Sequence, residues 1–106
     1  MIKHGVKTDI VELDPVVYRY ALDYFNLDPD HTAYLEDAVG FVDRESTRVE
    51  ERKQYDYIIH DVFTGGAVPA SLFTQEIFEG LKTLLAPDGV IAIVRPTQPC
   101  DTVCVR

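Results

Sequence analysis

The chain has 106 residues, which is enough for one domain and too few for two. Hydrophobic residues make up 46% of it and charged residues 26%, which is typical of a folded globular protein and argues against a disordered one. The 10 basic and 18 acidic residues give a net charge of -8, which disfavours nucleic acid and anionic membranes as partners, because phosphate groups bind positive charge.

The sequence carries no sign of a targeting segment or a metal site. Its first residues form no apolar run like that of a secretion signal, and no stretch is long enough to cross a bilayer, so we expect a cytoplasmic protein. The two cysteines, Cys100 and Cys104, lie close to the end of the sequence. Because two thiols cannot complete a zinc site alone, no metal is expected.

The first part of the chain alternates between strand and helix patterns. Apolar residues between acids predict a strand over 8–14, which ends before Pro15. Proline is favoured at the first position of a helix, and apolar residues then recur at helical spacing, so a helix is predicted over 15–25. After a turn segment rich in Asn, Asp and Pro, a short strand is predicted over 32–36.

The same alternation continues in the middle of the chain. Asp37 is the predicted N-cap of a helix over 37–53, whose later residues form a charged, solvated face. The segment 55–62, with the sequence YDYIIHDV, predicts the third strand. This strand delivers one carboxylate, that of Asp61, to a loop with two glycines.

The last part supplies the most regular helix and the most apolar strand. The helix is predicted over 71–85 with Ser71 as its cap and a continuous apolar side. A turn at 87–89 then leads into the strand 90–94.

The order β-α-β-α-β-α-β predicts an α/β fold. Strands that alternate with helices at this spacing form a parallel sheet with right-handed crossovers and helices on both faces. We predict one domain over 1–95 and an irregular tail over 96–106. Ligands of such sheets bind beyond the carboxyl ends of the strands.

Acidic residues gather at those predicted strand ends. Glu12 and Asp14 follow the first strand and project together, because residues two apart lie on one face of a strand. An acid at such a strand end commonly binds the ribose hydroxyls of a nucleotide, and Asp37 at a helix N-terminus could accept an exocyclic amine. Structural alternatives remain open: Asp37 caps its helix only, Asp14 sets up the Asp-Pro turn only, and Glu12 is simply solvated.

His60 lies beside Asp61 on the strand, so their side chains leave opposite faces, and His60 is predicted to be a core or rim histidine.

Three segments together resemble the spermidine/spermine synthase family, the aminopropyltransferases built on the Rossmann-like fold of S-adenosylmethionine-dependent methyltransferases. The segments are IVELDPVVYRYA, YLEDAVGFV and YDYIIHDVFTGGAVPASLFTQEIFEGLKTLLAPDGVIAI, and the resemblance covers about residues 4–94. It implies transfer of the aminopropyl group of decarboxylated S-adenosylmethionine to an amine such as putrescine.

The resemblance also implies roles for individual residues. The ExD motif of the family matches Glu12 and Asp14, of which the glutamate binds the ribose hydroxyls. Its acid-small pair matches Asp37 and Ala38, where the acid meets the adenine amino group. Its strand-end aspartate matches Asp61, the catalytic base that helps to deprotonate the attacking amine. A carboxylate suits this role, because an amine is protonated at neutral pH and nucleophilic only after it loses that proton.

The chain also departs from the family pattern. Members that act on diamines usually read DxxD, whereas here Thr64 stands in place of the second acid. The family's first strand, with its glycine-rich turn, has no counterpart in this sequence. Family topology places that strand between those predicted at 8–14 and 55–62, so the two either close up and pair or form half-sheets with unpaired edges. Such edges invite aggregation or completion by another chain, including a homo-oligomer.

We therefore expect a partial Rossmann-like, class I methyltransferase-like fold that lacks the first strand, in an incomplete and inactive fragment of an aminopropyltransferase. Its ligands are expected to be a small-molecule nucleoside and a cationic amine. Three alternatives stay open: a methyltransferase that uses S-adenosylmethionine itself, a catalytically dead nucleoside-binding or interaction module, and, with less support, a phospho-acceptor receiver domain.

Overall fold

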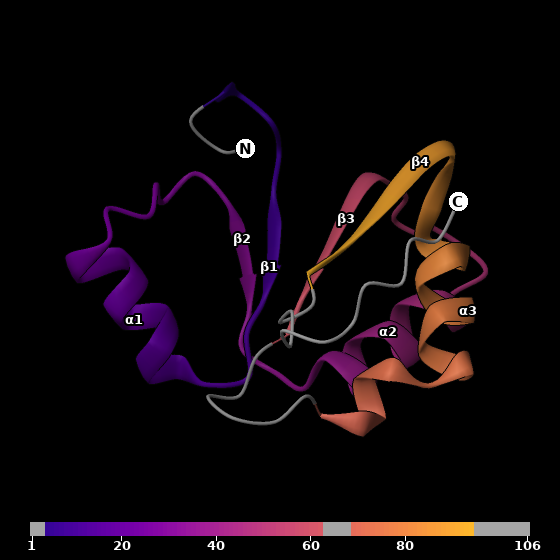
Figure 1. The fold of residues 1–106 in the computed structure, drawn as a ribbon. Coiled ribbons are helices and arrows are strands. Elements are labelled where there is room, and N and C mark those ends of the chain that lie inside the picture. Colours follow the sequence, from indigo (N-terminus) through magenta and orange to yellow (C-terminus); the bar gives the residue numbers. More distant parts are fainter. Residues whose placement is uncertain (1–3, 63–68, 95–106) are drawn as a thin grey trace, which may run out of the picture.

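A computed structural model describes residues 4–62 and 69–94, and within them strands and helices alternate as predicted (Figure 1). In chain order the elements are β1 (Asp9–Val11), α1 (Pro15–Tyr24), β2 (Thr32–Tyr34), α2 (Ala38–Thr47), β3 (Tyr55–Asp61), the 3₁₀ helix η2 (Ala70–Phe73), α3 (Gln75–Leu84) and β4 (Leu85–Val94). The predicted tail over 96–106 and Thr64 lie outside the described residues. No helix in the described ranges is long and apolar enough to cross a membrane.

The strands form two separate parallel pairs instead of one sheet. β1 pairs with β2 from Asp9↔Thr32 to Val11↔Tyr34, and β3 pairs with β4 up to Asp61↔Val94. In Figure 1 all four strands run toward the same edge of the molecule, and the two pairs stand next to each other. Of the two outcomes that the sequence left open, the structure has the second, in which half-sheets expose their edges.

Helices α2 and α3 join the two half-sheets through a shared apolar core. The buried centre consists of Phe41 and Val42 from α2 with Ile77 and Leu81 from α3. Side chains from both half-sheets pack on this centre, among them Val11 of β1 and Ile58 of β3. The fold is therefore held together beneath the strands, by helices, where an unbroken sheet would be held by its own ladder.

Gly80 allows α2 and α3 to approach this closely. A Cβ atom at Gly80 would lie 2.5 Å from Cγ1 of Val42, which is too close for two carbon atoms. The helix interior thus carries a residue of low helix propensity because contact between the helices requires it.

Two predicted boundaries at the end of the chain are wrong. Ser71 does not cap the helix, because it lies in η2, and the cap of α3 is Thr74, whose hydroxyl accepts from the backbone N–H of Ile77 at 3.4 Å. The turn predicted at 87–89 lies inside β4, which begins at Leu85. At the position of the predicted turn the register between β3 and β4 shifts, since Tyr55 pairs with Leu85 and Tyr57 already pairs with Val90.

Helices α1 and α2 both end before their predicted last residues. α1 ends one residue before its predicted end, whereas α2 ends at Thr47, six residues before its predicted end.

Glu45 is an exception to the solvated, charged face predicted for α2. It is buried and is paired with Arg44 and Arg48 at 3.1 and 3.2 Å. A buried carboxylate needs such partners to offset its lost hydration.

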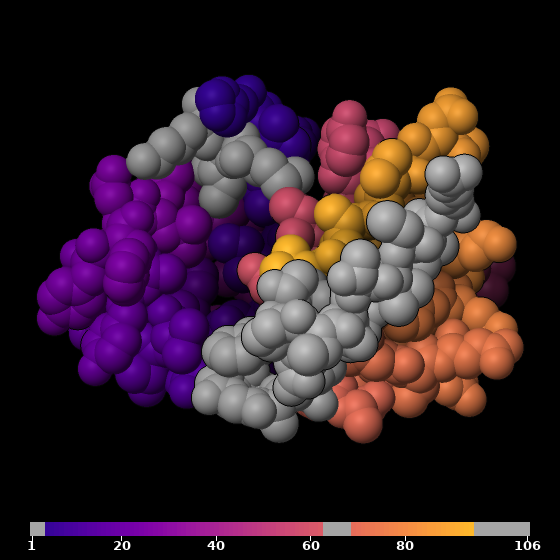
Figure 2. Space-filling model, viewed as in Figure 1, coloured from indigo at the N-terminus to yellow at the C-terminus, as the bar shows by residue number. Residues whose placement is uncertain are grey.

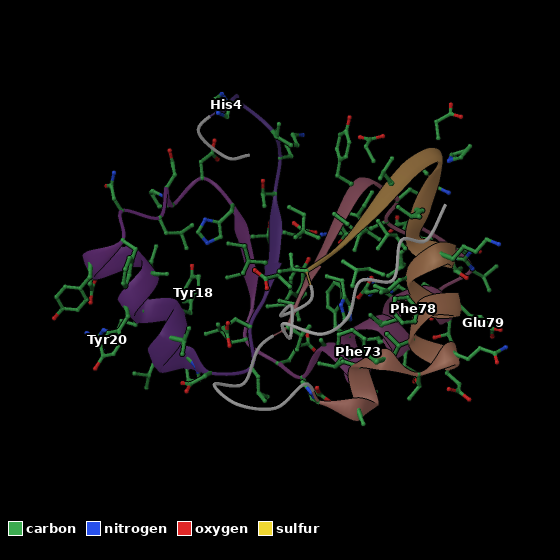
Figure 3. All side chains as sticks on the ribbon, viewed as in Figure 1. His4, Tyr18, Tyr20, Phe73, Phe78 and Glu79 are labelled. Carbon is green, nitrogen blue, oxygen red and sulfur yellow. The ribbon has the colours of Figure 1, made fainter. Side chains whose placement is uncertain are left out.

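The apolar pattern of α1 forms no buried face. Val16, Val17, Tyr20 and Tyr24 are all more than half exposed, and α1 contains no buried residue. In Figure 3 Tyr20 points away from the rest of the molecule. The helix is set by its cap and its proline more than by packing.

A polar cluster crosses from one half-sheet to the other at the amino ends of β1 and β3. Oδ2 of Asp9 accepts hydrogen bonds from Nζ of Lys53 and from the hydroxyl of Tyr55, both at 2.8 Å. Lys53 also donates to the hydroxyl of Tyr34 on β2 at 2.6 Å. Side chains, and no backbone ladder, thus connect β3 to β1.

The ionisation of Asp9 reflects these contacts. Burial alone would raise the pKa of the Asp9 carboxyl, but the hydrogen bonds from Lys53 and Tyr55 outweigh burial and hold the pKa below its usual range. A lowered pKa means that the ionised carboxylate stabilises the folded state above the ordinary pKa of an aspartate. That stabilisation is lost as the pH falls through the pKa of the folded state.

We predict that Asp9→Asn lowers the free energy of unfolding by about 1–3 kcal/mol at pH 7, because two hydrogen bonds to a charged group are weakened. The difference from the wild type should shrink as the pH falls below about 4, as measured by urea denaturation across a pH series. Asp56→Asn, which removes an exposed carboxylate from β3, serves as the control and should change stability little. A pH-independent effect of Asp9→Asn would refute the electrostatic account.

Candidate functional site

The predicted catalytic residue, Asp61, is the last residue of β3 and is exposed. Its neighbour His60 is buried, so the two side chains leave opposite faces of the strand as predicted. Nε2 of His60 lies 3.0 Å from the carbonyl oxygen of Leu72, and the ring is in edge contact with Phe73 at 4.8 Å between centroids. His60 is therefore a core histidine, as predicted, and it ties β3 to η2; Figure 3 labels Phe73 at this place.

Glu12 lies one residue beyond β1, next to the end of β2. Its backbone N–H donates to the carbonyl oxygen of Tyr34 at 3.0 Å, so the end of β1 stays attached to the end of β2. Oε1 of Glu12 accepts from the backbone N–H of Asp14 at 2.9 Å. Within the described residues no donor contacts Oε2, which leaves one carboxylate oxygen of Glu12 for a ligand.

Asp37 caps a helix, as its structural alternative predicted, and Asp14 also caps one, where the predicted alternative was the Asp-Pro turn. Oδ1 of Asp14 accepts from the backbone N–H of Val16 at 2.8 Å and begins α1. Oδ1 of Asp37 accepts from the backbone N–H of Val39 at 3.3 Å and begins α2. Each cap occupies one oxygen of its carboxylate, and both residues are exposed. The caps therefore leave the second carboxylate oxygen of both Asp14 and Asp37 for other partners.

A cavity of about 190 Å³ lies between the half-sheets. Its walls come from β1 and β3 and its floor from α2 and α3. Ala38 and Asp61 are among the lining residues, whereas Glu12, Asp14 and Asp37 are not. The space-filling view shows the surface hollowed between the indigo residues of β1 and the red residues of β3 (Figure 2).

The structure thus brings Ala38 and Asp61 to one cavity and places the other acids on the neighbouring strand and helix ends. All five residues lie at or just beyond the carboxyl ends of parallel strands, where ligands of α/β sheets bind. That these groups share one nucleoside remains a prediction.

Two interactions between distant residues were not foreseen from the sequence. The first is the Asp9–Lys53–Tyr55 cluster, whose members are 44 and 46 residues apart and form no motif. The second links α1 to the following loop, where the Tyr18 hydroxyl lies 2.9 Å from Nε2 of His31. Neither pair has a spacing that marks it in the sequence, since only the fold brings the partners together.

Comparison with known proteins agrees with the resemblance seen in the sequence. The spermine/spermidine synthase domain matches residues 1–101. The chain is 59% identical over 93 residues to the N-terminal histidine N-methyltransferase of Emericella nidulans, and 36% identical over 85 residues to the polyamine aminopropyltransferase of Vibrio vulnificus. These matches cover 88% and 78% of this chain but only 16% and 27% of the two relatives.

The fold also has a counterpart among solved structures. The crystal structure of human methyltransferase-like protein 13 in complex with SAH superposes with a TM-score of 0.71, at 24% identity, over 80% of this chain and 41% of that chain. The predicted partial α/β fold of the methyltransferase-like Rossmann type is therefore confirmed. Because the domain match spans nearly the whole sequence, the chain belongs to the spermine/spermidine synthase domain family.

Proposed function

We propose that the chain is part of a transferase that binds S-adenosylmethionine and passes its methyl group to an amine nitrogen. The observation that carries this proposal is the 59% identity, over 88% of the chain, to an N-terminal histidine N-methyltransferase. Identity to the polyamine aminopropyltransferase is lower, at 36% over 78% of the chain. The SAH held by the structural neighbour supports a ligand of the S-adenosyl type.

In this proposal the nucleoside contacts residues at the ends of β1 and β2. Glu12 has one carboxylate oxygen without a partner among the described residues, which suits a ribose hydroxyl. Asp37 uses Oδ1 for its helix and keeps Oδ2 for the adenine amino group. Ala38 lines the cavity with a single methyl group, so it leaves room for a flat ring.

Asp61 is the proposed base for the acceptor amine. It is exposed at the end of β3 and lines the cavity, so an acceptor can reach it from solvent. An α-amino group has a pKa of about 8 and is partly neutral at pH 7, whereas an alkyl amine like that of lysine has a pKa of about 10.4. One carboxylate is enough to orient and deprotonate an α-amino group.

The absence of a second acid at Thr64 fits this acceptor. A diamine carries a second ammonium group, and binding it in place of water calls for a second carboxylate. An acceptor with one amine needs no such partner.

Aminopropyl transfer from decarboxylated S-adenosylmethionine is the second candidate, and the domain match together with the aminopropyltransferase relative favours it. Asp61 would be the base in that reaction as well. For both candidates the proposal is a cytoplasmic enzyme without a metal.

We predict that S-adenosylmethionine and SAH raise the melting temperature of the chain more than decarboxylated S-adenosylmethionine or methylthioadenosine does. A ligand at 100 times its Kd stabilises the folded state by about 2.7 kcal/mol, which corresponds to a shift on the order of 10 °C for a domain of this size. Glu12→Gln should reduce the shift, and Glu50→Gln, an exposed residue between α2 and β3, should leave it unchanged. A larger shift with the decarboxylated compound would favour aminopropyl transfer, and no shift with any nucleoside would contradict both candidates.

We further predict that, in the full-length transferase of which this chain is a part, Asp61→Asn lowers methyl transfer to a peptide with an N-terminal histidine by about 10²- to 10⁴-fold, the usual effect of removing a general base. Transfer is measured with methyl-labelled S-adenosylmethionine. Asp56→Asn, which removes a carboxylate from the opposite end of β3, is the matched control and should keep full activity. Equal rates for Asp61→Asn and wild type would remove Asp61 from the mechanism.

A further inference from the structure

A short loop connects β2 to α2 and carries Asp37 of the candidate site. It consists of Leu35, Glu36 and Asp37, and Ala38 then begins α2 (Figure 1). The Asp37 carboxylate is exposed, and it accepts the capping hydrogen bond from the backbone N–H of Val39 at 3.3 Å. That bond is longer than the usual distance of about 2.9–3.0 Å, so the cap alone fixes the carboxylate only weakly.

The neighbouring residue, Glu36, is held much more firmly. The guanidinium of Arg44 donates from both terminal nitrogens to the two carboxylate oxygens of Glu36, at 2.6 and 2.9 Å. Arg44 lies eight residues further along, in the second half of α2. Because a paired guanidinium and carboxylate fix each other's orientation as well as their distance, this contact ties the loop to the body of the helix.

Arg44 is itself held by other residues of α2. Its Nε donates to Oε1 of Glu45 at 3.1 Å, and Glu45 is buried. The other oxygen of Glu45 accepts from Arg48 at 3.2 Å. The guanidinium of Arg44 also lies over the ring of Phe41, 5.5 Å from its centroid, and Phe41 belongs to the buried core. A chain of contacts therefore runs from the core through Arg44 to Glu36.

The pair also controls the charge next to Asp37. Glu36 and Asp37 are adjacent carboxylates, and like charges at this separation repel each other. The hydrogen bonds from Arg44 hold the pKa of the Glu36 carboxyl below its ordinary value, so Glu36 is ionised and paired at neutral pH. Because exposed ion pairs usually contribute little to stability, we expect loss of this pair to change the loop more than the stability of the fold.

We propose that Arg44 and Glu36 are positioning residues for the nucleoside, which orient Asp37 toward the amino group of the adenine ring. This inference rests on the proposed function, in which Asp37 accepts from that amino group. Arg44 touches no ligand and acts through the loop. The pair is therefore expected to affect selectivity for a purine with an amino group, and to leave contacts with the rest of the ligand unchanged.

The test compares binding of SAH with that of its deamino analogue, in which hydrogen replaces the adenine amino group. Both are measured by calorimetry on the full-length transferase of which this chain is a part. The wild type should bind SAH about tenfold or more tightly than the analogue, because the analogue lacks a hydrogen bond to a carboxylate. Arg44→Gln and Glu36→Gln should each reduce this preference to less than about threefold, with unchanged affinity for the analogue.

Two further variants separate the pair from the rest of the network. Arg48→Gln is the matched control, because Arg48 shares Glu45 with Arg44 while its described hydrogen bond goes to Glu45 and not to Glu36. It should keep the preference of the wild type. Asp37→Ser retains an oxygen that caps the helix and removes the second one, so it should abolish the preference. Adding Arg44→Gln to Asp37→Ser should then have no further effect on the preference, since both changes act through one contact.

A second measurement needs no ligand. In the isotope-labelled chain, the backbone amides of the loop from Leu35 to Asp37 should have NMR order parameters of about 0.85 in the wild type and in Arg48→Gln. In Arg44→Gln they should fall below about 0.6, with a melting temperature close to that of the wild type.

The possible contrary results distinguish this inference from the proposed function. If Asp37→Ser abolishes the preference but Arg44→Gln and Glu36→Gln keep it, the positioning role is wrong and the adenine contact of Asp37 stands. An equal loss of affinity for both ligands in Arg44→Gln, or the same loss of preference in Arg48→Gln, would also overturn the positioning role. A wild type that binds both ligands equally, or neither, would contradict the adenine contact and with it the role of the pair.

Discussion

The structure depends on a core that lies under the strands and not between them. Backbone hydrogen bonds hold β1 to β2 and β3 to β4, but none of the described backbone pairs joins β1 to β3. What joins the two half-sheets is burial of Val11 and Ile58 against α2 and α3, helped by Asp9 and its side-chain partners. Hydrophobic packing does not depend on direction, so it can hold two half-sheets in place where no ladder connects them.

This arrangement divides the residues of the candidate site between the two half-sheets. The acids at the ends of β1 and β2 belong to one half-sheet, and Asp61 belongs to the other. Their relative position is set by α2, whose first residue, Ala38, lies at the same cavity as Asp61. A ligand that touched both half-sheets would therefore stabilise their relative position as well as the fold.

Much of the fold could be predicted from local patterns in the sequence. Asp-Pro before a helical apolar pattern located the start of α1, and Asp37 located the start of α2, because a capping carboxylate acts within two residues of itself. Other features of the helices were harder to predict. Ser71 and Thr74 can both cap a helix, and in the structure Ser71 lies in η2 while Thr74 caps α3. The apolar residues of α1 recur at helical spacing, but they form no buried face among the described residues, since burial depends on neighbours that a local pattern cannot contain.

For the candidate site, too, local features could be predicted from the sequence and most contacts between residues could not. The sequence identified acids at strand ends and predicted the cap at Asp37, and the structure places these residues there. The sequence did not reveal that Glu12 accepts from the backbone N–H of Asp14 or that Asp14 caps α1. The split between the half-sheets was one of two outcomes left open, because neither outcome has a local pattern in the sequence. Hydrogen exchange of the free chain tests this point most directly. The account predicts that β3 amides bonded to β4 exchange slowly, while those that face β1 exchange at least tenfold faster. Uniform protection across β3 and β1 would show a continuous sheet and contradict it.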